Sequence, residues 1–188
     1  AQSKGIFHAE GELVDAVVKF QPDWPAAERM NGIARFVNDG FVVEGSAQLA
    51  GIAASGLRAE LPHYGNAALS VRAKSDADAG RLLALLRRSP LHKEHADSLD
   101  NLSAGGKVAA TFGLDLPLEG EHAPPRIDGT IELQDATLGD ARWKLAFEGV
   151  RGSVRYDQDG FAARDLAVVR DGRPGSLSLR AGPSHVRE

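Results

Sequence analysis

The segments MNGIARFVNDGF, residues 30–41, and VRGSVRYDQDGF, residues 150–161, follow one pattern at positions displaced by 120 residues. In each segment, apolar side chains and glycine occupy alternate positions up to an Asp-Gly pair, which is typical of a strand with one buried face. Asp-Gly favours a tight hairpin turn, because glycine tolerates positive φ. Each segment therefore predicts a β-hairpin with positive φ at Gly40 or Gly160. We expect valine at either position to cost at least ~1 kcal/mol, with similar and nearly additive effects.

The residues that precede the two hairpins match at the same displacement. Residues 13–18 align with 133–138, and in both the apolar side chains change parity at an aspartate, Asp15 or Asp135. A parity change inside a strand predicts a β-bulge or a sharp bend. A tryptophan, Trp24 or Trp143, then lies before each hairpin. The sequence predicts a repeated β unit over about 4–50 and 124–170, and the alternative is a chance recurrence of one hairpin.

A helical pair interrupts the strands over about 76–102. Leucines and alanine recur there at helical spacing, any of Ser75, Asp76 or Asp78 can cap the first helix, and Pro90 ends it. A second short helix follows and is expected to end at Gly105-Gly106. The clearest strand is 108–118, and Leu177 and Leu179 predict a last one. The fold class is therefore mainly β (α+β): one module over 1–188, with a curved antiparallel sheet or groove and an inserted helical pair.

Composition excludes several classes of protein. The 188 residues carry a net charge of −4 with basic residues spread among acidic ones, which argues against a nucleic-acid partner. Without cysteine there is no disulfide or thiolate chemistry. No stretch reads as a signal peptide or a transmembrane segment. The chain begins with alanine in what reads as a strand, which we interpret as an excerpt of a longer protein.

Motifs for catalysis, metals and cofactors are weak. His92 and His95 are spaced for a metal on a helix, but a third ligand is lacking and exposed polar residues explain them. The stretch 157–160, DQDG, starts like a calcium loop, but Val168 stands where such a loop needs glutamate, so we interpret the stretch as a turn. We predict no catalytic residue, no metal and no cofactor. A small-molecule or sugar-processing enzyme is the least favoured alternative.

Six short motifs lie at residues 4–10, 20–25, 31–36, 85–91, 114–118 and 126–129. In their order and spacing, these motifs resemble the large AsmA-like proteins of the YhdP type. The resemblance covers nearly the whole chain and implies a non-enzymatic periplasmic segment of a protein that moves phospholipid between the inner and outer membranes of Gram-negative bacteria. It also implies an N-terminal inner-membrane helix, which this chain lacks, and contacts with adjacent segments of a longer chain.

On this hypothesis, alternating apolar side chains line a groove for acyl chains. The same alternation fits the closed core of an ordinary β domain, and the sequence leaves both possibilities open. A structural or protein-interaction module that docks its neighbours through strand edges is the main alternative function. The candidate lipid-facing residues are Val108, Phe112, Leu114, Leu116, Ile127, Ile131 and Leu133.

Overall fold

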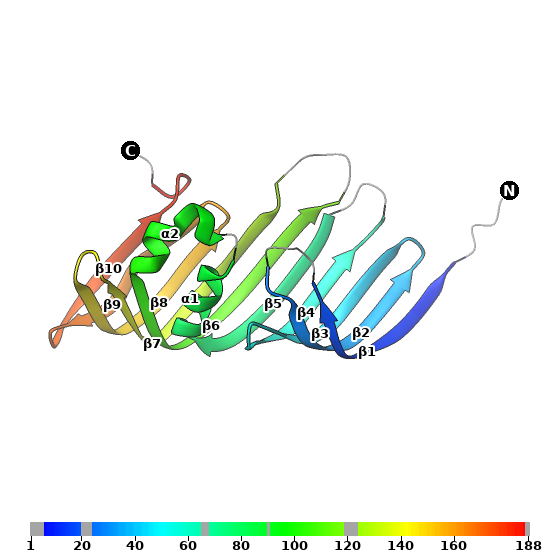
Figure 1. Ribbon diagram of the computed structural model, residues 1–188, viewed down its shortest axis with the longest axis horizontal. Coiled ribbons are helices and arrows are strands. Elements are labelled where there is room, and N and C mark those ends of the chain that lie inside the picture. The colour runs from blue at the N-terminus through cyan, green and yellow to red at the C-terminus, as the bar shows by residue number, and fades with distance from the viewer. Residues whose placement is uncertain (1–5, 20–23, 65–67, 90, 119–123, 187–188) are drawn as a thin grey trace.

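The computed structural model describes residues 6–19, 24–64, 68–89, 91–118 and 124–186 and contains ten strands and two helices (Figure 1). The helices lie between β5 and β6. In chain order the elements are β1 (His8–Val18), β2 (Ala27–Val37), β3 (Gly40–Leu49), β4 (Ile52–Leu61), β5 (Ala68–Asp78), α1 (Ala79–Arg87), α2 (Leu91–Asn101), β6 (Leu102–Pro117), β7 (Arg126–Asp140), β8 (Leu145–Asp157), β9 (Gly160–Arg170) and β10 (Arg173–Ala181).

All ten strands form one antiparallel sheet in which each strand pairs with its neighbours in the sequence. The order β1 to β10 leaves β1 and β10 at the two edges, so the sheet does not close into a barrel. This arrangement confirms the predicted fold class, a mainly β chain with a curved antiparallel sheet and an inserted helical pair.

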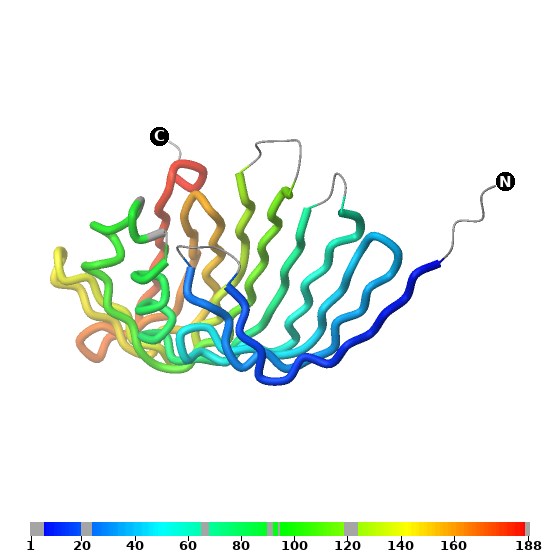
Figure 2. Tube along the Cα trace, turned by 45° about the vertical axis from the view of Figure 1, so that its right-hand side comes forward, coloured from blue at the N-terminus to red at the C-terminus, as the bar shows by residue number. Residues whose placement is uncertain are grey.

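The sheet is bent into a trough because bulges interrupt most of its strands near their middle (Figure 2). At each bulge the register with a neighbouring strand shifts, and a bulge bends its strand. The parity changes at Asp15 and Asp135 are two of these bulges, as the sequence predicts, with φ of 49° and 66°. The positive-φ residues within the strands are Asp15, Arg29, Gly56, Gly106, Asp135, Gly149, Gly152, Gly160 and Asp165.

The two aspartate bulges contact residues at matching positions, although through different groups. The backbone N–H of Asp15 donates to Oδ1 of Asn31 at 3.0 Å, and Nη2 of Arg151 donates to Oδ1 of Asp135 at 3.3 Å. Asn31 and Arg151 occupy matching positions at the same 120-residue displacement as the aspartates. These contacts support the interpretation of residues 4–50 and 124–170 as two copies of one β unit, which stays a prediction.

The helical pair begins and ends slightly inside the predicted range of 76–102. Asp78 is the last residue of β5 and also caps α1, because its Oδ1 accepts hydrogen bonds from the backbone N–H groups of Gly80 and Arg81 at 2.9 and 3.2 Å. Pro90 lies outside the described residues. The expectation that Gly105-Gly106 ends the second helix is wrong: β6 already begins at Leu102 and passes through a bulge at Gly106, where φ is 90°.

The two Asp-Gly turns differ in conformation. Gly160 has φ of 154°, but Gly40 is not among the residues with positive φ, so the prediction of equivalent glycines is wrong. In the first hairpin Asn38 takes the left-handed position, with φ of 55°, and Gly40 then starts β3. Gly40 has another reason to lack a side chain, because a Cβ atom there would collide with the carbonyl oxygens of Leu61 and Pro62.

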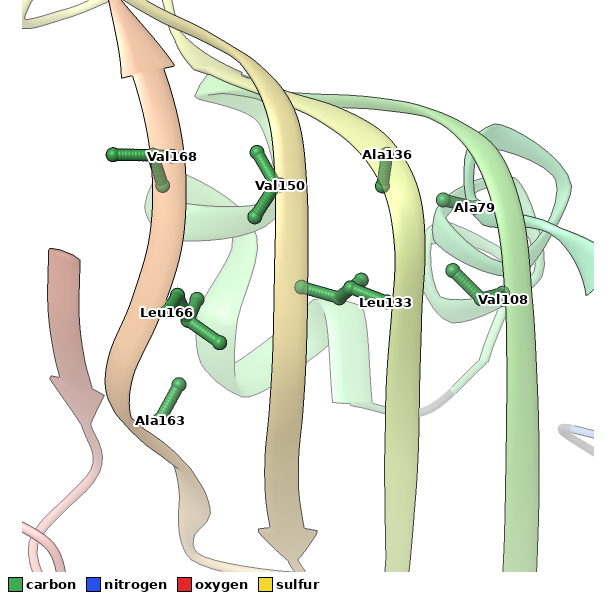
Figure 3. Packing of buried hydrophobic residues seen from close by; sticks show 8 residues of the cluster. All are labelled: Ala79, Val108, Leu133, Ala136, Val150, Ala163, Leu166 and Val168. Carbon is green, nitrogen blue, oxygen red and sulfur yellow. The ribbon is translucent and has the colours of Figure 1, made fainter. Parts of the chain in front are cut away.

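The hydrophobic core lies toward the β10 end of the trough (Figure 3). Leu166 of β9 is fully buried, and its side chain packs over Gly152 of β8, where a Cβ atom would lie 2.8 Å from a Leu166 methyl group. Ala79 of α1 joins the same cluster, which places this helix against the sheet face that the cluster occupies. The cluster consists of Ala79, Val108, Leu133, Ala136, Val150, Ala163, Leu166 and Val168.

Candidate functional site

The candidate site is the sheet face that carries Phe112 and Val108, which we call the inner face. Neighbouring strands are in register there, so that apolar side chains and glycine form rows across the sheet. One such row crosses seven strands without a polar residue, and it results directly from the alternation in each strand. It contains Gly11, Ala34, Val43, Ala59, Val71, Leu114 and Ile127.

The inner face has two parts that differ in exposure. Over α1 and β6–β9 the eight-residue cluster occupies part of it, and we call this cluster the packed end. Over β2–β5, the open end, most side chains on this face keep partial solvent exposure. Phe36 is 36% exposed and lies at one rim in an aromatic group with Phe41 and Tyr64. The ring centroids of Phe36 and Phe41 are 6.1 Å apart, and those of Phe41 and Tyr64 are 6.3 Å apart. The partly exposed inner-face residues of the open end are Phe36, Phe41, Val43, Leu57, Ala59, Leu69, Val71 and Ala73.

All seven predicted lipid-facing residues lie on the inner face, but they are not equally accessible. Val108 and Leu133 are 2% and 6% exposed in the packed end, and Leu114 is also buried. The other four, Phe112, Leu116, Ile127 and Ile131, are half-buried. Three of the seven are thus buried, and four keep partial solvent exposure.

The opposite, outer face is polar and is held together by ion pairs between strands. Arg35 of β2 bridges Glu10 and Glu44 at 2.9 and 2.8 Å, and Arg58 of β4 also contacts Glu44. Farther along the sheet, Arg72 of β5 pairs with Asp115 of β6 at 2.9 Å. The sheet therefore has one charged, solvated face and one apolar face.

These ion pairs and one turn lower the pKa of three carboxyl groups. Hydrogen bonds from Arg35 and Arg58 lower the pKa of Glu44, and a hydrogen bond from Arg72 lowers that of Asp115. Partial burial pushes the pKa of Asp157 upward, but hydrogen bonds with His185 and with the backbone N–H groups of Asp159 and Gly160 outweigh it and lower the pKa overall.

We expect the chain to lose stability in acid. A carboxyl group whose pKa is lower in the folded state stabilises the fold above its unfolded pKa, and this contribution disappears as pH falls through the folded value. The loss should therefore begin near the ordinary values of 4.5 and 3.8 and grow below them. Urea unfolding at stepped pH measures this, and Glu44→Gln should flatten the dependence. A urea midpoint that stays constant between about pH 5 and pH 3 would contradict the account.

Tyr156 interrupts the apolar inner face with a hydroxyl group, but this group is internally bonded. It donates to the backbone carbonyl of Thr111 at 2.7 Å, and its ring passes over Gly129, where a Cβ atom would collide with it. Burial, with a smaller contribution from Asp128, raises the pKa of Tyr156 to about 12. The phenol therefore stays neutral at physiological pH and adds no charge to this face.

Other predicted sites have structural roles. Nε2 of His92 lies 2.9 Å from a carboxylate oxygen of Asp100, and within the described parts of the chain no three potential ligands gather to hold a metal ion. Oδ1 of Asp157 accepts from the backbone N–H groups of Asp159 and Gly160, which confirms that the calcium-loop-like stretch is a turn. Among the described residues, neither helix has the length and apolar character needed to cross a membrane.

The sequence did not predict one contact on this face. Trp24, from the connection between β1 and β2, packs against Phe112 of β6 with ring centroids 6.4 Å apart. The repeat placed Trp24 before a hairpin but gave no signal of its partner, because the two residues are far apart in the chain.

Comparison with known proteins supports the resemblance stated above. The family model described as YhdP protein matches residues 1–185. The intermembrane phospholipid transporter YhdP of Escherichia coli (strain K12) is 29% identical over 153 residues, which cover 77% of this chain and 12% of that protein. The chain thus matches only a small part of its curated relative. No solved structure matches the chain. Since the family model extends over nearly all of its residues, the chain belongs to the YhdP family.

Proposed function

We propose that this chain is a non-enzymatic, periplasmic segment of a phospholipid-transport protein, and that the open end of its inner face holds acyl chains. The similarity to an intermembrane phospholipid transporter supports the lipid class and a place between the inner and outer membranes. In a longer protein, an N-terminal helix would attach the chain to the inner membrane, and adjacent segments would continue the sheet from its edges.

The observation that carries the proposal is that the sheet has two different faces over β2–β5. The inner face presents rows of partly exposed apolar side chains, and the opposite, outer face is charged. Each methylene taken out of water is worth ~0.8 kcal/mol, so roughly 10 kcal/mol opposes the passage of a long acyl chain through water. A sheet face of half-buried apolar side chains lowers this barrier along its whole width. The charged outer face keeps the same sheet in contact with water, which an extended segment between two membranes requires.

Native mass spectrometry of the purified 188-residue chain tests the proposal. We expect masses that correspond to bound phospholipid, and we expect Val43→Asp to abolish them because a carboxylate in the centre of the open end disfavours hydrocarbon. Glu12→Gln is the matched control, since it changes one charge on the neighbouring edge strand and should leave binding unchanged. A folded chain without lipid, prepared with and without added phospholipid, would contradict the proposal.

A second candidate function is a structural module that docks neighbouring segments through its edge strands. The observation that favours it is β1, which lies at one edge of the sheet and exposes Val14 and Val17 by 70% and 67%. This function predicts self-association or partner capture that survives Val43→Asp but fails when a proline is placed in β1, because proline removes a backbone donor from the edge. Lipid binding that survives the proline separates the two functions.

A further inference from the structure

The contact between Trp24 and Phe112 spans the trough. In the sheet order four strands, β2 to β5, separate β1 from β6. The two rings nevertheless lie with centroids 6.4 Å apart and planes tilted by 58°. The contact is possible because the rim formed by the ends of β1 and β2 curls over the inner face, as the blue strand ends in front of the middle strands show in both views (Figures 1 and 2).

This aromatic pair lies between the packed end and the open end of the inner face. Toward β10, Val108 and Leu133 are buried beneath Ala79 of α1, and the packed end is full. Toward β1, most inner-face side chains of β2–β5 are partly exposed, whereas Ala34 and Leu61 are buried. A hydrocarbon chain needs about 3.5–4 Å to the atoms on either side of it, so none fits between the two rings as they lie.

We propose that Trp24 and Phe112 form the closed end of the acyl-chain site, so that a bound chain lies across β2–β5 with its tail against Trp24. The dimensions agree: four strand spacings from β2 to β6 measure about 19 Å. One leaflet's acyl chain spans about half of a hydrocarbon core that is roughly 30 Å thick. One acyl chain thus fits along the inner face between β2 and Phe112 of β6. This inference rests on the proposed function, because it takes the occupant to be a phospholipid.

The chain carries its own probe for this inference, since Trp24 and Trp143 are its two tryptophans. Trp143 is 66% exposed on the turn between β7 and β8, where it stacks with Arg142 and lies outside the open end. Trp143→Phe leaves Trp24 as the only indole, and Trp24→Phe leaves Trp143. Both variants should unfold at nearly the same temperature as the parent chain, so that their quenching by lipid can be compared.

Phosphatidylethanolamine with brominated acyl chains, which quenches tryptophan emission on contact, is added to each variant. We expect the Trp143→Phe chain to lose most of its emission with brominated lipid and little with unbrominated lipid, and the Trp24→Phe chain to change little with either. If mass spectra show bound lipid but Trp24 is not quenched, the inference fails and the proposed function stands. Equal quenching of both tryptophans indicates adsorption to the surface and overturns the inference. Failure of any lipid to bind overturns both.

Discussion

Leu166→Ala should lower the free energy of unfolding by about 2–5 kcal/mol, among the largest effects of any single truncation in this chain. The side chain of Leu166 is fully buried, and it packs over Gly152 within the packed end. Truncation leaves a cavity whose lining cannot collapse easily, because Val150 and Ala163 beside it are themselves at most 1% exposed.

Leu57→Ala is the matched control for this prediction. Leu57 lies on the inner face of β4 in the open end and is only half-buried, so its truncation should cost about 1 kcal/mol. Urea unfolding of the two variants measures the difference. Equal costs would show that the open end is packed as tightly as the core, and the distinction between the two parts of the inner face would then be wrong.

Gly160→Val should destabilise the chain by about 3 kcal/mol or more, through two causes that act together. The backbone at Gly160 has φ of 154°, which a β-branched residue rarely adopts. A Cβ atom there would also collide with the carbonyl of Ala181 at the end of β10, so the pairing of the last two strands must loosen.

Gly40→Val should destabilise the chain by about 1–3 kcal/mol through the steric collision alone. Gly40 lacks positive φ, but a Cβ atom at this position would collide with the carbonyl of Pro62. Gly11→Val serves as a control, because nothing lies within 4 Å of a Cβ atom at that position, and its effect should stay within about 0.5 kcal/mol. Thermal unfolding of the three variants decides the order. A cost at Gly160 no greater than at Gly11 would refute the described geometry of the second hairpin.

The sequence was sufficient to predict the features that depend on a few consecutive residues. Alternation placed all seven candidate residues on one face, and the parity changes at Asp15 and Asp135 located two bulges. Asp78 was among the predicted caps and is the observed one. In each of these cases the side-chain pattern of a few consecutive residues determines the local structure.

The sequence was insufficient to predict the features that depend on pairing or packing between distant segments. Gly105-Gly106 suggested a helix end, because glycine favours helix ends as well as bulges, but pairing with β7 carries β6 through this point. Val108 and Phe112 have the same parity in one strand, yet only Val108 is sealed, because α1 packs near it. The contact between Trp24 and Phe112 depends on the bend of the whole sheet, which no local pattern encodes.

Photo-crosslinking from adjacent positions of β6 tests most directly whether the inner face holds phospholipid. A photoreactive amino acid replaces Phe112 or Leu116 on the inner face, or Thr111 or Asp115 on the outer face of the same strand, and the chain is irradiated with phospholipid vesicles. We predict lipid adducts from Phe112 and Leu116 and few from Thr111 and Asp115. Equal labelling from both faces, or a folded chain that gives no adduct from either inner position, would contradict the account.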